Sequence, residues 1–98
     1  MTDLEIEIYI TDHAYDRMKE RLGWNRKAAA RMAKKAFEEG VEHKDTVGSL
    51  HRYLDYVYLG HCNANQMRIY GEALFIFYGN RLITVYALPT KYRRKKYI

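Results

Sequence analysis

The stretch QMRIYGEALFIFYGNRLITVYALP, residues 66–89, predicts three antiparallel strands joined by two tight turns. The turns at 71–72 and 79–80 have the two-residue length and the glycine typical of β-hairpins. Between them, β-branched and aromatic residues dominate, as they do in strands. We therefore expect strands at about 66–70, 73–78 and 81–88.

The turn lengths fix an expected register and assign side chains to two faces of this meander. A predicted core face carries Met67, Ile69, Leu74, Ile76, Ile83, Val85 and Ala87. A mixed polar and aromatic face carries Arg68, Tyr70, Phe75, Phe77, Leu82, Thr84 and Tyr86. On the mixed face, the register predicts one row of Arg68, Phe75 and Thr84, and a second of Tyr70, Ala73 and Tyr86.

The first half of the chain predicts a strand followed by helices. Residues 4–10, LEIEIYI, alternate between apolar and polar, which is typical of a half-buried strand. Thr11 and Asn25 are good N-caps, and they predict helices over 12–22 and from 26 to Gly40. The apolar residues of 49–59 recur at helical spacing, which predicts a third helix. Their tyrosines and valine are also common in strands, so a strand is the alternative.

The expected fold is therefore α+β. It has an N-terminal strand, two to three helices and the meander, which together form a four-stranded sheet with helices on one face. A chain of 98 residues has room for a single domain, expected over residues 1–90.

The net charge of +5 comes from the last eight residues. Residues 1–90 carry twelve basic and twelve acidic side chains, so this part of the chain is balanced. The tail, residues 91–98, is expected to contact phosphates and to make binding salt-dependent. The alternative is a solvated terminus without a ligand. The basic residues of the tail are Lys91, Arg93, Arg94, Lys95 and Lys96.

Other features of the sequence argue against a membrane protein, a disulfide-bonded protein and a metalloprotein. No apolar run is long enough to cross a membrane, and a single cysteine, Cys62, cannot form an internal disulfide. We therefore expect a soluble cytoplasmic protein without a membrane partner. His43, His51, His61 and Cys62 form no C-x-x-C or H-x-x-x-H motif, so neither a metal nor a cofactor is expected.

The mixed face carries residue types that suit phosphodiester cleavage without a metal. Arg68 supplies a cation, Thr84 a donor to the phosphate and Tyr86 a group that moves a proton. Phenols such as Tyr70 also stack on unpaired bases. The alternative interpretation is that the third helix covers the aromatic residues and makes this face a second core.

His13 opens the first predicted helix, and Arg17 and Arg21 follow it on the same stripe. An imidazole beside two cations suits a general base acting on RNA. A packing role beside Ala14 and Met18 is the alternative.

Two segments resemble a known group of proteins. ITDHAYDRMKER, residues 10–21, resembles the H-A-x-x-R-M-x-x-R helix of small bacterial and phage domains, and the meander resembles their closing hairpins. Those domains are grouped with the barnase, EndoU, colicin and RelE-like nuclease superfamily. In that superfamily, N-terminal helices pack on a four-stranded antiparallel sheet, and many members cleave RNA without a metal.

The resemblance, together with the stacking argument for Tyr70, predicts a catalytic set and an RNA-binding set. The catalytic set is His13, Arg17, Arg68, Thr84 and Tyr86. The RNA-binding set is Tyr70, Arg21 and the basic residues of the tail.

The leading hypothesis is an endoribonuclease of the RelE-like toxin type, acting on single-stranded RNA or mRNA with an antitoxin as partner. The balanced charge of residues 1–90 departs from that family and leaves enzymatic activity open. The second hypothesis is a non-catalytic phage or prophage accessory protein, which inhibits a host defence protein or binds a nucleotide-like ligand on the same face. The third is a homodimer that buries the exposed tyrosines.

Overall fold

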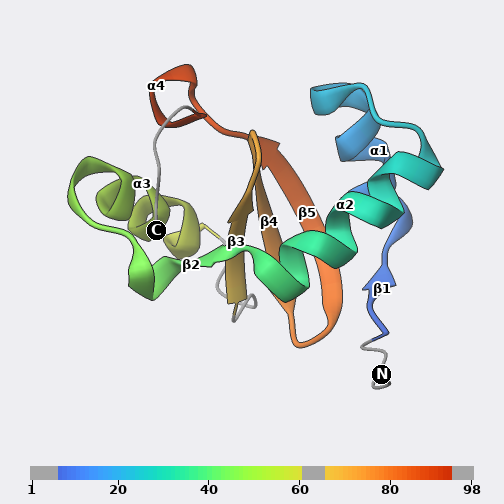
Figure 1. Ribbon diagram of the computed structural model, residues 1–98, viewed down its shortest axis with the longest axis horizontal. Coiled ribbons are helices and arrows are strands. Elements are labelled where there is room, and N and C mark those ends of the chain that lie inside the picture. Colours follow the sequence, from blue (N-terminus) through green and yellow to red (C-terminus); the bar gives the residue numbers. More distant parts are fainter. Residues whose placement is uncertain (1–6, 61–65, 94–98) are drawn as a thin grey trace.

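The computed structural model describes residues 7–60 and 66–93 (Figure 1). The predicted strand residues 4–6, His61, Cys62 and the tail residues Arg94, Lys95 and Lys96 lie outside the described residues. The elements follow in the order β1 (Tyr9–Ile10), α1 (Asp12–Leu22), α2 (Arg26–Glu39), β2 (Val41–Glu42), the 3-10 helix η1 (His43–Asp45), α3 (Gly48–Leu59), β3 (Gln66–Tyr70), β4 (Ala73–Tyr78), β5 (Arg81–Ala87) and α4 (Thr90–Arg93).

The α+β class and the β3–β4–β5 meander are confirmed, but the sheet differs from the prediction. It has five strands in the order β1-β5-β4-β3-β2. The strand β2, which was not predicted, pairs antiparallel with β3, and β1 pairs parallel with β5. The expected sheet of four strands is therefore wrong, because the two residues after Gly40 extend it at the β3 edge.

The helix ends follow the capping residues. The Thr11 hydroxyl accepts a hydrogen bond from the Ala14 backbone N–H at 3.0 Å, and the Asn25 side chain accepts one from Ala28 at 2.8 Å. Gly23 ends α1 in the left-handed conformation, with φ of 74°, which glycine adopts without strain. Residues 48–59 are helical, so the helix interpretation of this segment is confirmed.

Helices cover both faces of the sheet, with α1 and α2 on one side and α3 on the other (Figure 1). The prediction that they lie on one face is therefore wrong. The physical reason is β4, in which five successive residues are buried, so that each face of this central strand requires cover. The α1–α2 face buries Ala73, Phe75, Phe77, Leu82 and Val85, and the α3 face buries Met67, Ile69, Leu74, Ile76 and Leu88.

A β-bulge changes the predicted register of β5. Phe77 pairs with Leu82 as expected, but Ile76 pairs with Thr84, so Ile83 is the additional residue. The Thr11 hydroxyl donates to the Leu82 carbonyl at 3.1 Å and lies 3.4 Å from the Ile83 carbonyl, which holds the strand at this point. After the bulge, every side chain of β5 lies on the opposite face from the one predicted.

The two predicted cross-strand rows are therefore wrong. Phe75 lies between Arg68 and Val85, and Ala73 lies between Tyr70 and Ala87. Thr84 and Tyr86 lie instead on the α3 side of the sheet, beside Ile76 and Leu74. Arg68 is consequently separated from Thr84 and Tyr86 by the sheet itself.

The chain after β5 is attached to α3. Tyr92 of α4 is buried, its hydroxyl donates to the Ser49 carbonyl at 3.2 Å, and its ring lies 5.6 Å from that of Tyr53. The first residues of the predicted tail thus belong to the packed structure. Among residues 7–60 and 66–93, no helix combines the length and the apolar character that a membrane span requires.

Candidate functional site

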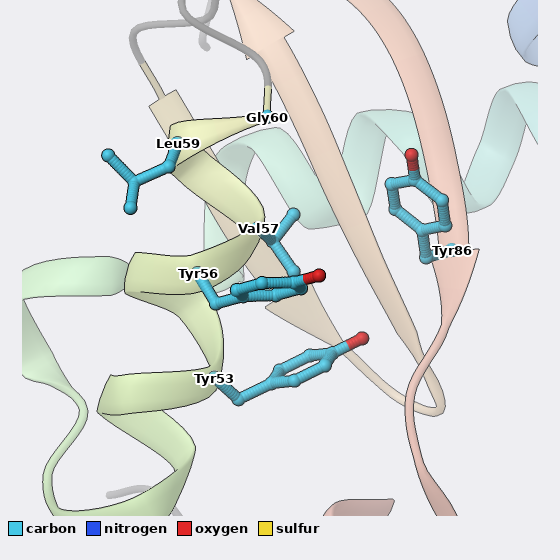
Figure 2. Close-up of a pocket in the computed structure, with 6 residues that line it drawn as sticks. All are labelled: Tyr53, Tyr56, Val57, Leu59, Gly60 and Tyr86. Carbon is cyan, nitrogen blue, oxygen red and sulfur yellow. The ribbon is translucent and has the colours of Figure 1, made fainter.

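An open pocket of about 610 Å³ lies between α3 and β5 (Figure 2). It is predominantly aromatic, with phenol hydroxyls as its side-chain polar groups. Figure 2 shows the rings of Tyr53 and Tyr56 one above the other, both pointing from α3 towards the strand that carries Tyr86. The lining residues are Tyr53, Tyr56, Val57, Leu59, Gly60 and Tyr86.

The helix α3 places the two tyrosines because residues three apart share a helix face. Tyr53 is half-buried and packs beside Tyr92, whereas Tyr56 is 77% exposed. Burial raises the pKa of the Tyr53 phenol above its ordinary value, and the phenols of Tyr86 and Tyr92 raise it further. One wall of the pocket is therefore a fixed, protonated phenol, and the other is an accessible ring.

Arg21, which is not among the lining residues, contacts the ring of Tyr86 on the opposite wall. Its Nη1 donates to the Val85 carbonyl at 2.9 Å, and its guanidinium carbon lies 4.5 Å from the centre of the Tyr86 ring. Within the described residues, β1 pairs with β5 only at Arg81 and Leu82. The arginine thus occupies the exposed edge of β5 and reaches the Tyr86 ring.

A second open pocket, of about 440 Å³, lies at the other end of β5. His13 and Arg81 line it together with Tyr78, and all three side chains are exposed. Arg81 also lies over the Tyr9 ring, with its guanidinium carbon 5.0 Å from the ring centre. An imidazole, a guanidinium and a phenol therefore line the same open pocket.

The structure does not bring the predicted catalytic residues together in one site. His13 lines the second pocket and Tyr86 the first, while Thr84 is buried on the same side of the sheet. Arg17 forms an ion pair with Glu20 at 2.6 Å.

Arg68 lies on the α1–α2 side of the sheet. It donates to the Gln66 side chain at 2.5 Å and lies over the Phe37 ring. This placement separates it from Thr84 and Tyr86, which lie on the α3 side of the sheet.

The predicted RNA-binding residues are also divided. Tyr70 packs against the α1–α2 cluster, away from the tyrosine pocket. Arg21 contacts Tyr86, a residue that lines the tyrosine pocket, and Lys91 lies over the Tyr92 ring at 5.2 Å. Arg93 belongs to α4, and the remaining tail residues lie outside the described residues.

Tyr53, Tyr56 and Arg81 belong to no site predicted from the sequence. The spacing of Tyr53, Tyr56 and Val57 contained a usable signal, because it places aromatic side chains on one face of a helix. A further cluster that was not predicted, His43, His51 and Asp55, lies on the other side of α3.

Comparison of the chain with models of known families, with curated proteins and with solved structures finds no match. The functional conclusion therefore rests on the geometry of the two pockets.

Proposed function

We propose that the protein binds single-stranded RNA along the α3 side of β5, with an unpaired base in the pocket formed by Tyr53, Tyr56 and Tyr86. The observation that supports this function is the guanidinium of Arg21 on the Tyr86 ring at the pocket. Aromatic walls stack on bases of any sequence, and a neighbouring arginine binds the phosphate.

The size and character of the pocket favour a flat unsaturated ring. Its volume lies within the range of about 300–1,000 Å³ that is usual for small-ligand sites, and such sites combine apolar walls with a few polar groups. Bases in a duplex are stacked on each other and cannot enter such a pocket. The site therefore favours single strands over duplexes.

The experiment is fluorescence anisotropy with a labelled oligoribonucleotide, used alone and annealed to its complement. We expect the single strand to bind at least about tenfold more tightly than the duplex. Tyr86→Leu removes about 1–3 kcal/mol of stacking, a loss of roughly five- to 150-fold in affinity. Arg21→Gln lowers affinity and reduces its salt dependence.

The controls separate this pocket from the predicted site. Tyr58→Leu removes an exposed tyrosine of α3 that does not line the pocket, and Arg68→Gln removes the arginine on the opposite face. Both variants should bind like the wild type. Loss of binding in Arg68→Gln with retention in Arg21→Gln would contradict the proposed site.

A second candidate function, RNA cleavage, is favoured by the cleft that contains His13 and Arg81. An RNA strand that follows β5 from Tyr86 to Arg81 covers five residue steps, roughly 17 Å, and reaches this cleft. There His13 would take the proton of the 2′-hydroxyl as its oxygen attacks the adjacent phosphorus, and Arg81 would stabilise the negative charge that develops on the phosphate. The bond from phosphorus to the 5′-oxygen would break, and the 5′-oxygen would leave with a proton taken from water.

Cleavage is tested by incubating RNA with the purified protein in excess chelator. We expect His13→Ala and Arg81→Gln to lower the cleavage rate by at least about 100-fold while the anisotropy assay still reports binding. Lys27→Gln, on the exposed surface of α2, is the control. Intact RNA after incubation with the wild type excludes cleavage and leaves the binding proposal to its own test.

A further inference from the structure

Two histidines and an aspartate gather where η1 meets α3. His51 and Asp55 are one helical turn apart on α3, and the fold brings His43 of η1 against them. The Asp55 Oδ1 atom lies 2.7 Å from Nε2 of His43 and 3.6 Å from Nε2 of His51. One ligand atom from each of the three residues can be chosen so that all lie within 4.8 Å of one another.

Thr46 determines which nitrogen of His51 carries the proton. Its hydroxyl, which is buried, has one proton and donates it to the His43 carbonyl at 2.7 Å. The contact of 3.0 Å between this hydroxyl and Nδ1 of His51 must then be a hydrogen bond from Nδ1–H to the oxygen. A neutral His51 consequently has its lone pair on Nε2.

That lone pair is beside the Asp55 carboxylate, so two acceptor atoms lie together. A metal ion between these two acceptor atoms would be bound by both of them. Neutral imidazole nitrogens and a carboxylate oxygen are ligands of zinc, and a hydrogen bond at the other ring nitrogen is the usual means of orienting such a histidine.

We propose that His43, His51 and Asp55 bind a divalent transition-metal ion of the zinc type. Tetrahedral bonds of about 2.0–2.1 Å place neighbouring ligand atoms roughly 3.3 Å apart. The separations of 2.7 and 3.6 Å to Asp55 lie on either side of this value. The three ligand atoms lie within 4.8 Å of one another, so side-chain rotations that bring them closer would complete the site. Three protein ligands leave a fourth position for water.

The ion would join η1 to α3, the helix whose opposite face carries Tyr53 and Tyr56. Because a ligand that binds only the folded chain stabilises it, zinc should raise the melting temperature. At a free concentration of 100 times Kd, we expect an increase of roughly 10 °C for a domain of this size. This effect does not depend on RNA binding.

The experiment is a zinc titration of the untagged full chain, stripped with chelator, in competition with a chromophoric zinc indicator. We expect one ion per chain, with affinity at least about 100-fold lower in His51→Ala and in Asp55→Ala. Thr46→Val should lower affinity about 10- to 100-fold through the loss of the orienting bond, and Thr46→Ser should restore it.

The controls are His13→Ala and the double variant His61→Ala/Cys62→Ser, both of which leave the three ligands in place. Wild-type zinc affinity and the zinc-dependent rise in melting temperature in these controls support the site. The proposal is overturned by an absence of zinc binding in the wild type. It is also overturned by wild-type affinity in Asp55→Ala, or by loss of binding in the double variant.

Discussion

Thr11 connects two elements through one hydroxyl. Its oxygen accepts the Ala14 N–H at the start of α1, and its proton goes to the Leu82 carbonyl beside the bulge of β5. The same residue therefore caps a helix and holds the strand that carries Tyr86. Removal of the Thr11 hydroxyl should therefore destabilise both α1 and β5.

We expect Thr11→Val to lower the free energy of unfolding by about 1–2 kcal/mol, since a cap is lost and the Leu82 carbonyl loses a donor. Urea denaturation followed by circular dichroism measures the change. Thr11→Ser keeps the hydroxyl and should lose less than half as much. Equal losses in the two variants would show that the methyl group, rather than the hydroxyl, carries the effect.

Tyr53 should make the folded chain less stable at alkaline pH. Burial raises the pKa of its phenol above the unfolded value of 10.0, so the folded chain holds this proton more tightly than the unfolded chain. The stabilisation is complete below the unfolded pKa, and it is lost as the pH rises through the folded pKa.

Tyr53→Phe should therefore reduce the fall in the free energy of unfolding as the pH rises above the unfolded pKa of 10.0. Urea denaturation at several pH values measures this slope. Tyr56→Phe, which changes a phenol that is 77% exposed, should leave the slope unchanged. If both variants reduce the pH dependence of the free energy of unfolding equally, the effect does not come from Tyr53.

At the scale of the elements, the junction of α2 and β2 depends on Gly40. A Cβ atom at this position would lie 2.5 Å from the Ala36 carbonyl oxygen and 2.9 Å from the Arg68 Cβ. Both distances are shorter than ordinary contacts, and the first neighbour is backbone that cannot rotate away. Glycine thus allows α2 to end directly against β3.

We expect Gly40→Ala to lower the free energy of unfolding by about 2 kcal/mol, because the added methyl group forces the chain apart. Gly60→Ala is the matched control, since its Cβ meets only the Val57 carbonyl oxygen, at 3.5 Å. Thermal and urea denaturation of the two variants test this. A stable Gly40→Ala protein would mean that α2 and β3 adjust more easily than their packing indicates.

The elements were predictable where local chemistry defines them. Thr11, Asn25 and the glycines after each helix predicted the helices, and the two-residue turns predicted the meander. β2 escaped prediction because two residues carry no periodic pattern, and its pairing depends on β3, far along the chain.

The bulge was unpredictable for a different reason. Residues 82–86, LITVY, offer apolar or aromatic side chains to both faces, so a shift of one residue leaves a reasonable pattern on each side. The predicted site depended on this register. It therefore grouped Arg68 with Thr84 and Tyr86, whereas Arg21 is the arginine that contacts Tyr86.

At the scale of the whole molecule, the net positive charge and the pocket formed by Tyr53, Tyr56 and Tyr86 come from different parts of the chain. The net charge of +5 belongs to the residues that follow Thr90, and Tyr92 attaches this segment to α3, one wall of the pocket. The tail is therefore expected to add phosphate contacts to RNA held at Tyr86.

Replacing Arg94, Lys95 and Lys96 with glutamine should reduce the slope of log affinity against log salt by about 2, which corresponds to three phosphate contacts of a single strand. Anisotropy titrations over a range of salt measure this slope. The control replaces Lys27, Lys34 and Lys35, three exposed residues of α2. A similar decrease in the control would mean that the tail acts only through total charge.

The parallel pairing of β1 with β5 has a consequence for the order of assembly. The meander joins segments that are close in sequence, whereas Tyr9 meets Arg81 only after a loop of about 70 residues has closed, at an entropic cost of roughly 4 kcal/mol. We expect the meander to form early and β1 to join late. Because Thr11 follows β1 and bonds the Leu82 carbonyl, the docking of the first strand completes the arrangement of the last.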